Sequence, residues 1–234
     1  RQDRLSDALQ QTYKRLSDNQ RMLIEYKFFE PSFYTTDIPD WGTSYAHCLQ
    51  LGEKAMVCVD TGHHAPGTNI EFIVAVLLRA KRLGAFDFNS RFYADDDLIV
   101  GAADPFQLFR ILHEVNINGG FDVGTPVSFV LDQCHNIEAK IPGQIRSILN
   151  VQEATAKALL VDQVALKAAQ KEGDVLEANS VLMDAYNTDV RPLLEEWRAD
   201  KGIDPNPMKA FKASGYLKKI ADTRVGGNQA GWGA

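Results

Sequence analysis

The chain has 234 residues, of which 45% are hydrophobic and 24% charged, which is the composition of an ordinary globular protein with one large domain or two small ones. The net charge of −6, with no basic stripe interleaved with aromatic residues, argues against a nucleic-acid-binding protein. No apolar stretch approaches the roughly 18 residues that indicate a membrane span, and no signal peptide opens the chain, so we expect a cytoplasmic protein without a membrane partner.

The hydrophobic pattern predicts four successive units of strand, loop and helix. An amphipathic helix over residues 3–18 precedes them, and more helical sequence follows them. The expected strands are residues 22–27, 55–60, the start of FDFNSRFYADDD, and 126–136. The expected helices are 44–51, 69–83, 105–115, 145–169, 175–186 and 189–199, with Asp104 as a predicted N-cap.

Apolar strands separated by helical connections predict a parallel sheet covered by helices, as either a doubly wound sheet or a barrel. No GxGxxG motif follows a strand, which argues against the dinucleotide-binding version. Four units are about half of a (β/α)₈ barrel of roughly 250 residues. Because the first residues already have helical spacing and no initiator Met is present, we expect the natural N-terminus to lie upstream. The glycine-rich tail VGGNQAGWGA is expected to be disordered, or to dock by close backbone approach.

Every expected strand leads into charged or histidine side chains, most of which can bind metal ions. They are Glu25 and Lys27 after the first strand, Asp60, His63 and His64 after the second, Asp95, Asp96 and Asp97 after the third, and Asp132 and His135 after the fourth. The carboxyl ends of parallel strands converge on one face, so these carboxylates would lie together. Their mutual repulsion would be relieved by divalent cations, and the oxygen and nitrogen ligands suit Mn²⁺, Co²⁺, Mg²⁺ or Zn²⁺.

The spacing within these segments supports the same interpretation. In the D-x-x-H segment from Asp60 to His63, a loop can turn both side chains inward, and the same spacing recurs after the fourth strand. In an extended D-x-D segment, Asp95 and Asp97 would face the site while Asp96 faces elsewhere.

Each residue also has a simpler interpretation. A single aspartate at a strand end often caps a helix or forms a turn. His64 would then support its neighbours rather than bind metal, His47 and His113 would be surface or core-edge residues, and Lys27 would pair with Glu30. Cys48, Cys58 and Cys134 have no CxxC spacing and are expected to be reduced, mostly buried thiols. The coincidence of ligands at four successive strand ends nevertheless favours a metal site.

Two divalent ions among carboxylates serve phosphoester hydrolysis or polarise neighbouring oxygens of a sugar. Only Lys27 and Arg91 supply positive charge near the strand ends, which favours the sugar. Lys27 would stabilise negative charge on a substrate oxygen. Aromatic residues in the same loops would pack on a sugar or within the loops. They are Tyr26, Phe28, Phe33, Tyr34 and Trp41.

The segments IEYKFFEPSFY, VDTGHHAPGTNIEFIVAVLLR, FDFNSRFYADDDLIVGAADPFQLFRI, LDQCHN and RVGGNQAGWGA resemble the L-rhamnose isomerase family, in its bacterial branch distinct from the enteric enzyme. The resemblance covers most of the chain, and HHAPGTN and YADDDL are its specific motifs. It implies a (β/α)₈ TIM barrel of the xylose-isomerase-like type, with residues 1–140 as the C-terminal half and 141–234 as a helical C-terminal extension packing on the barrel or a neighbouring subunit. It also implies a homotetramer with two divalent ions, commonly Mn²⁺. Such an enzyme interconverts L-rhamnose and L-rhamnulose, often with other aldoses.

The resemblance also assigns the site residues. They are Glu25, which matches a carboxylate bridging toward both ions, Asp60 and Asp132, which match ligands of the structural ion, and His63, Asp95 and Asp97, which match ligands of the catalytic ion. Lys27 matches a lysine beside the substrate oxygens. The implied catalytic residues are Glu25, Lys27 and Asp132, and the implied substrate contacts are Lys27, His63, Asp95 and Asp132.

Two departures from the family pattern leave alternatives open. Asp87 stands where better-known members have a histidine ligand, so it either binds the metal or is structural. The family's long N-terminal portion, which supplies the first barrel strands, is absent from this chain, so the activity is expected of the whole enzyme. The competing interpretations are a sugar epimerase, a barrel phosphodiesterase of the endonuclease type, and a non-catalytic metal-binding or assembly subunit.

Overall fold

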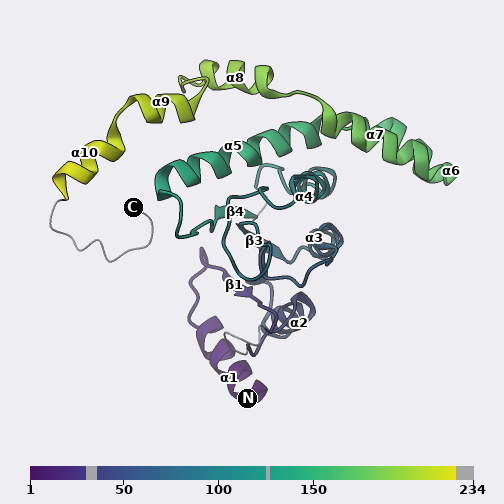
Figure 1. Ribbon diagram of the computed structural model, residues 1–234. Helices are drawn as coiled ribbons and strands as arrows, with labels where there is room; N and C mark the ends of the chain where they lie inside the picture. The colour runs from purple at the N-terminus through teal and green to yellow at the C-terminus, as the bar shows by residue number, and fades with distance from the viewer. Residues whose placement is uncertain (30–35, 125–126, 225–234) are drawn as a thin grey trace. The chain divides into compact units, whose positions relative to one another are not determined.

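The computed structural model describes residues 1–29, 36–124 and 127–224, which divide into two compact units (Figure 1). The first unit comprises Arg1–Asp97 and Arg110–Asp132, and the second comprises Leu98–Phe109 and Gln133–Ala234. The glycine-rich tail and the aromatic residues Phe33 and Tyr34 lie outside the described residues.

A parallel sheet of four strands in the order β1-β2-β3-β4 forms the centre of the first unit. The strands are β1 (Met22–Glu25), β2 (Ala55–Asp60), β3 (Leu83–Phe88) and β4 (Ser128–Leu131). Each strand lies next to the one that follows it in the chain, so the strand order does not reverse direction as it does in a doubly wound sheet. Right-handed crossovers in such an order place the connecting helices on the same face. The prediction of parallel strands is therefore confirmed, and these four strands form an open α/β sheet.

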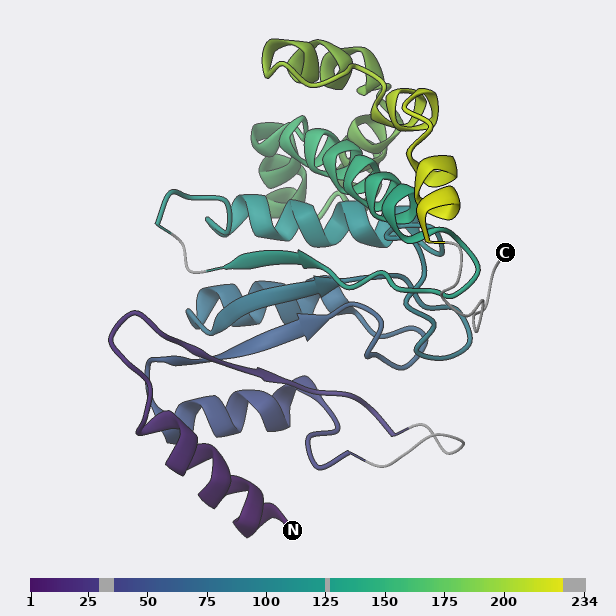
Figure 2. The ribbon, with the colours of Figure 1, turned by 90° about the vertical axis from the view of Figure 1, so that its left-hand side faces the viewer.

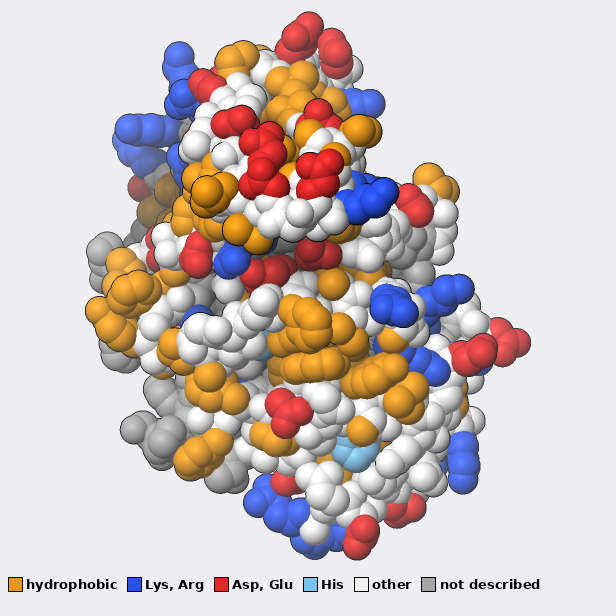
Figure 3. Space-filling model, turned by 90° about the vertical axis from the view of Figure 1, so that its right-hand side faces the viewer, with side chains coloured by type: hydrophobic (Ala, Val, Ile, Leu, Met, Phe, Trp, Pro, Cys, Tyr) orange, Lys and Arg blue, Asp and Glu red, His pale blue; other side chains and the backbone are white. Residues whose placement is uncertain are grey.

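The helices of the first unit are α1 (Gln2–Tyr13), α2 (Trp41–Leu51), α3 (Ile70–Arg79) and the later part of α4 (Pro105–Ile117). Figure 1 shows α2, α3 and α4 on one side of the strands, and Figure 2 shows the strands from the opposite side. On the strands themselves, Leu23 and Phe129 remain 44% and 40% exposed. The outer helical face also carries exposed apolar side chains, including Leu49 and Phe72, and Figure 3 shows hydrophobic groups gathered there.

The interior of the sheet explains why these segments form strands. All six residues of β2 are buried, and Val57, Val59 and Phe86 are fully excluded from solvent. Such a continuous apolar run is typical of a parallel strand that is covered on both faces. Gly84 allows close packing, because a Cβ there would lie 2.5 Å from Leu23 Cδ2 and 2.6 Å from Met56 Cβ. This packing holds the carboxyl ends of the strands in fixed positions.

The second unit is helical in its described part after β4. Its helices are α5 (Lys140–Leu159), α6 (Gln163–Glu172), α7 (Val175–Asn187), α8 (Arg191–Asp200), α9 (Pro207–Ala213) and α10 (Tyr216–Thr223). Ala156, Val190 and Leu194 form a buried cluster in this unit. The predicted N-cap is also confirmed, because Asp104 accepts a 2.8 Å hydrogen bond from the backbone N–H of Gln107.

Several predicted boundaries are wrong. The helix expected over 69–83 ends at Arg79, and Leu83 begins β3. The helix expected over 145–169 is broken after Leu159, because the Asp162 side chain accepts hydrogen bonds from two backbone N–H groups and starts α6. The first helix ends at Tyr13 instead of continuing to residue 18, and α9 and α10 were not predicted.

The minor predictions for histidines and thiols have mixed outcomes. His47 and His113, expected at the surface or the edge of the core, are buried, which excludes the surface alternative. All three cysteines are free thiols, as predicted, but only Cys48 and Cys58 are buried, and Cys134 is exposed.

Candidate metal centre

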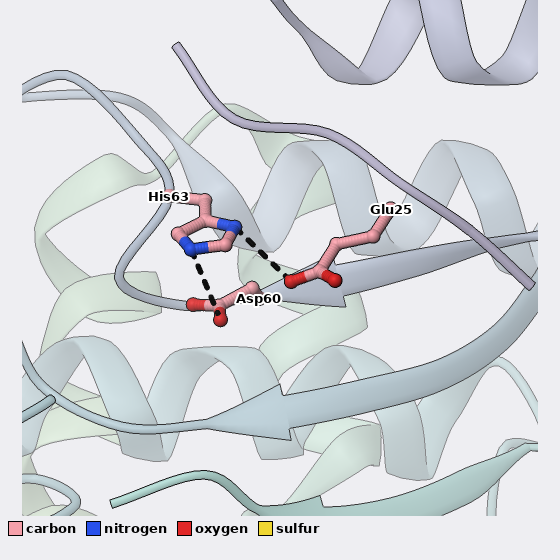
Figure 4. A group of neighbouring side chains, drawn as sticks. All are labelled: Glu25, Asp60 and His63. Carbon is pink, nitrogen blue, oxygen red and sulfur yellow. Dashed lines mark ion pairs between the residues drawn. The ribbon is translucent and has the colours of Figure 1, made fainter. Parts of the chain in front are cut away.

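Glu25, Asp60 and His63 form a group at the carboxyl end of the sheet whose ligand atoms all lie within 4.8 Å of one another. Glu25 is the last residue of β1, Asp60 is the last residue of β2, and His63 lies in the turn that follows β2. Figure 4 shows each ring nitrogen of His63 facing one of the two carboxylates. The parallel pairing of β1 with β2 brings these strand ends together, as the sequence pattern predicts.

Both ring nitrogens of His63 face oxygen atoms. Its Nδ1 lies 3.1 Å from Glu25 Oε1 and 3.0 Å from the carbonyl oxygen of Tyr26. Its Nε2 lies 3.5 Å from Asp60 Oδ2 and 3.4 Å from Asp95 Oδ1. Burial acts to lower the pKa of His63, but these carboxylates outweigh it and raise the pKa to about 10. Oxygen atoms of Glu25, Asp60 and Asp95 therefore surround the protonated ring of His63. The same oxygens could bind a divalent cation in place of a ring proton.

Asp60 is fully buried, and its two oxygens have different surroundings. Oδ1 accepts hydrogen bonds from the backbone N–H of Gly62 at 2.7 Å and from the Asn89 side chain at 2.8 Å. Oδ2 has no hydrogen-bond partner among the described residues. Burial raises the pKa of this carboxyl to about 7. A buried carboxylate with one oxygen fixed by hydrogen bonds and the other facing only the His63 ring, at 3.5 Å, fits a metal ligand better than a turn-forming residue.

Lys27 and Asp95 form an ion pair beside His63. Lys27 is buried, and its ammonium group donates to Asp95 Oδ2. Burial acts to raise the pKa of Asp95, but His63 and Lys27 outweigh it and lower the pKa to about 2. Asp95 therefore stays ionised and connects the lysine to the histidine. The alternative partner of Lys27, Glu30, lies outside the described residues.

Three further predicted ligands belong to the same electrostatic neighbourhood. Burial, followed by Asp95 and Asp132, raises the pKa of Asp97 to about 6. Burial, followed by Asp87 and Glu25, raises the pKa of Asp132, and burial is also the largest cause of the raised pKa of Asp87. Asp87 lies beside Asp60 in the register of β2 and β3. The carboxylates thus repel one another, and bound cations would relieve that repulsion.

Other strand-end residues have local roles. The Asp96 carboxylate accepts from the backbone N–H groups of residues 92, 93 and 94, and so does not join the group around His63. His64 Nε2 lies 2.7 Å from the Tyr26 hydroxyl, which supports a structural role. His135 lies in the second unit, where its Nδ1 is 3.6 Å from a Glu138 oxygen.

Two contacts of the site were not predicted. The Asn89 side chain donates a hydrogen bond to Asp60. A signal for this existed in the sequence, because Asn89 follows Asp87 by two residues in an extended segment, and such residues face the same side of a sheet. The Cys58 thiol lies 3.5 Å from Asp87 Oδ2. Burial, followed by Asp87, raises the pKa of that thiol well above its ordinary value. The available donors are therefore carboxylate oxygens and imidazole nitrogen, which suit hard divalent cations.

Comparison with known proteins finds similarity to sugar isomerases. No protein-family model matches the chain. A probable sugar isomerase of Rhizobium meliloti (strain 1021) and another of Mesorhizobium japonicum are each 41% identical to it over 227 residues, or 95% of the chain. The chain is a homologue of probable sugar isomerases. It spans about half the length, 52%, of these relatives.

The homology supports the predicted reaction class, a sugar isomerase, without identifying a particular sugar. The α/β sheet with its parallel strands is consistent with a sugar isomerase of the TIM-barrel type. Among the described helices, none has the length and apolar character needed to cross a membrane.

Proposed function

We propose that the protein containing this chain is a metal-dependent aldose–ketose isomerase that interconverts L-rhamnose and L-rhamnulose. The observation that carries the proposal is the buried Asp60 carboxylate, whose Oδ2 accepts no hydrogen bond among the described residues and lies next to Glu25 and His63. Homology to probable sugar isomerases supports the reaction class. The choice of L-rhamnose follows from the motif resemblance, and other aldoses are accepted to a lesser extent. The working form is a homotetramer.

The chain's own residues would hold two divalent cations, with Mn²⁺ as the first candidate and Co²⁺, Mg²⁺ and Zn²⁺ as alternatives. When bound, the cations supply Lewis-acid polarisation of the oxygens on C1 and C2 of the sugar. The ligands proposed are Glu25, Asp60, His63, Asp87, Asp95, Asp97 and Asp132. They fit this role because burial and mutual repulsion leave several of these carboxylates with a raised pKa.

The same side chains would orient the sugar and move its protons. Lys27 is buried and charged next to Asp95, so it can donate to a substrate oxygen on which negative charge develops. Glu25 and Asp132 are more accessible to solvent than Asp60, so they can accept and return a proton at the reacting carbons. His63 and Asp95 would contact the sugar oxygens from the β2 and β3 sides of the site.

The test is formation of ketose from L-rhamnose by the intact protein after EDTA treatment and again after addition of Mn²⁺. Turnover should disappear with EDTA, return with Mn²⁺, and fall at least about 100-fold in Glu25→Gln. Glu53→Gln is the matched control, because Glu53 is exposed in the turn before β2 and has the same chemistry. Its turnover should equal that of the wild type.

A C2-deuterated aldose distinguishes the alternatives. An isomerase moves the label to C1 or loses it to water as the ketose forms, whereas an epimerase yields a second aldose. Hydrolysis of a phosphodiester without ketose formation would replace the proposal with the phosphodiesterase. Mn²⁺ binding without turnover on any aldose would favour the non-catalytic subunit.

A further inference from the structure

Arg91 lies in the loop after β3 and touches the loops that follow β1, β2 and β3. Its Nη1 donates to the carbonyl oxygens of Gly62 at 3.2 Å and His64 at 2.9 Å. Its Nη2 donates to the carbonyl oxygen of Tyr93 at 3.3 Å. Its guanidinium carbon lies 4.6 Å from the centre of the Phe28 ring. One side chain therefore connects three segments that are far apart in the sequence.

Each of these contacts is close in sequence to a residue of the candidate metal centre. The two carbonyl groups after β2 belong to the residues on either side of His63. Phe28 directly follows Lys27, and Tyr93 precedes Asp95 by two residues. Arg91 thus holds three backbone carbonyl groups and the Phe28 ring, and these contacts restrain the backbone that carries Lys27, His63 and Asp95.

A second contact ties the first two loops together. The Tyr26 hydroxyl lies 2.7 Å from His64 Nε2, and the two rings meet edge to face with centroids 5.3 Å apart. Both side chains are buried. The Tyr26 carbonyl oxygen also lies 3.0 Å from His63 Nδ1. Arg91 adds backbone contacts to the side-chain contacts of Asp95 and Asn89 that join these two loops to the segment after β3.

We propose that Arg91 is a positioning residue, which holds the loops carrying Lys27, His63 and Asp95 at the spacing that the metal site needs. Its effect on metal binding rests on the proposed function, and its effect on the loops does not. A planar guanidinium can donate to separate carbonyl groups while one face lies on an aromatic ring. A lysine at this position keeps the charge but cannot reproduce that geometry.

The decisive variant is Arg91→Lys in the intact protein, compared with Arg82→Lys. Arg82 is a matched control, because its Nη1 also donates to two carbonyl oxygens, those of Gly52 at 2.6 Å and Ala55 at 3.0 Å, at the opposite end of β2. Amide hydrogen exchange is measured without metal. In Arg91→Lys, residues 61–65 and 91–97 should exchange about tenfold faster. In Arg82→Lys they should exchange as in the wild type. Unchanged protection in Arg91→Lys overturns the inference.

The second readout is calorimetric titration with Mn²⁺, with melting temperatures measured in parallel. Arg91→Lys should bind Mn²⁺ about 10- to 100-fold more weakly than Arg82→Lys at a similar melting temperature, and its kcat should fall more than its KM rises. Faster exchange with unchanged Mn²⁺ affinity would overturn the link from loops to metal. If the wild type neither binds Mn²⁺ nor converts a sugar, the proposed function fails, while the exchange experiment still decides the role of Arg91.

Discussion

Replacing Asp60 with asparagine should stabilise the metal-free protein while removing its response to metal. The carboxyl group is fully buried, and its Oδ2 has no hydrogen-bond partner among the described residues. The amide has nearly the same shape, and its oxygen can still accept from Gly62 and Asn89. Asp60→Asn therefore removes a buried charge and keeps the hydrogen bonds that hold the turn.

The magnitude follows from the pKa of Asp60, which lies at about 7 instead of the ordinary 3.8. At about pH 8, ionisation of this group makes the folded state about 4 kcal/mol less stable than it would be with an unshifted pKa. The new amide N–H group is left without a partner in place of Oδ2, which costs about 1–3 kcal/mol. The net expectation is a gain of about 1–3 kcal/mol, or a rise in Tm of several degrees.

Thermal denaturation at about pH 8, with EDTA and with Mn²⁺, measures both effects. Mn²⁺ should raise the Tm of the wild type and leave that of Asp60→Asn unchanged. Asp104→Asn is the control, because asparagine caps α4 as well as aspartate does, and it should leave both values unchanged. A metal-free Asp60→Asn that melts below the wild type would refute the cost assigned to the buried charge. An undiminished response to Mn²⁺ would refute Asp60 as a ligand.

The metal-free protein should lose stability as the pH rises from about 4 to about 8, because the pKa values of Asp60 and Asp97, about 7 and about 6, exceed the ordinary 3.8. A flat profile of Tm against pH in EDTA would contradict this. Asp96→Ala removes the acceptor for three backbone N–H groups and should weaken Mn²⁺ binding about tenfold by calorimetry, whereas Asp96→Asn, whose one amide oxygen can still accept from residues 92 and 93, should weaken it less. Ser147→Ala leaves the buried Val100 N–H unpaired and should cost about 1–3 kcal/mol in urea denaturation, and a smaller loss would show that the N–H finds another acceptor.

The number and order of these four strands, and the bounds of β2, could be predicted from the sequence because they depend on local pattern. AMVCVD is a continuous apolar run, and the strand observed at Ala55–Asp60 has the predicted bounds. Parallel pairing then requires Glu25 and Asp60 to lie at the same edge of the sheet. The chemistry of this edge follows from residue types at four strand ends, without any detail of packing.

The helix ends could not be predicted in the same way. After α3, the chain leaves the helix at Lys81, which has a φ of 56°, a conformation that glycine or asparagine usually marks. The apolar spacing continues past this point to Leu83, so periodicity alone extends the helix. The face that Asn89 occupies could be read from its spacing to Asp87, but the partners of Asn89 and Arg91 could not be predicted, because these contacts join segments that only the folded sheet brings together.

The Cys58 thiol beside Asp87 also bears on how the site withstands oxidation. Peroxides attack the thiolate form of cysteine, and burial together with nearby carboxylates keeps this sulfur protonated. A thiol in that state also competes poorly for soft cations such as Cu⁺, which bind thiolate. The acidic surroundings that would attract a hard cation thus shield the neighbouring sulfur from both oxidative damage and capture of the wrong metal.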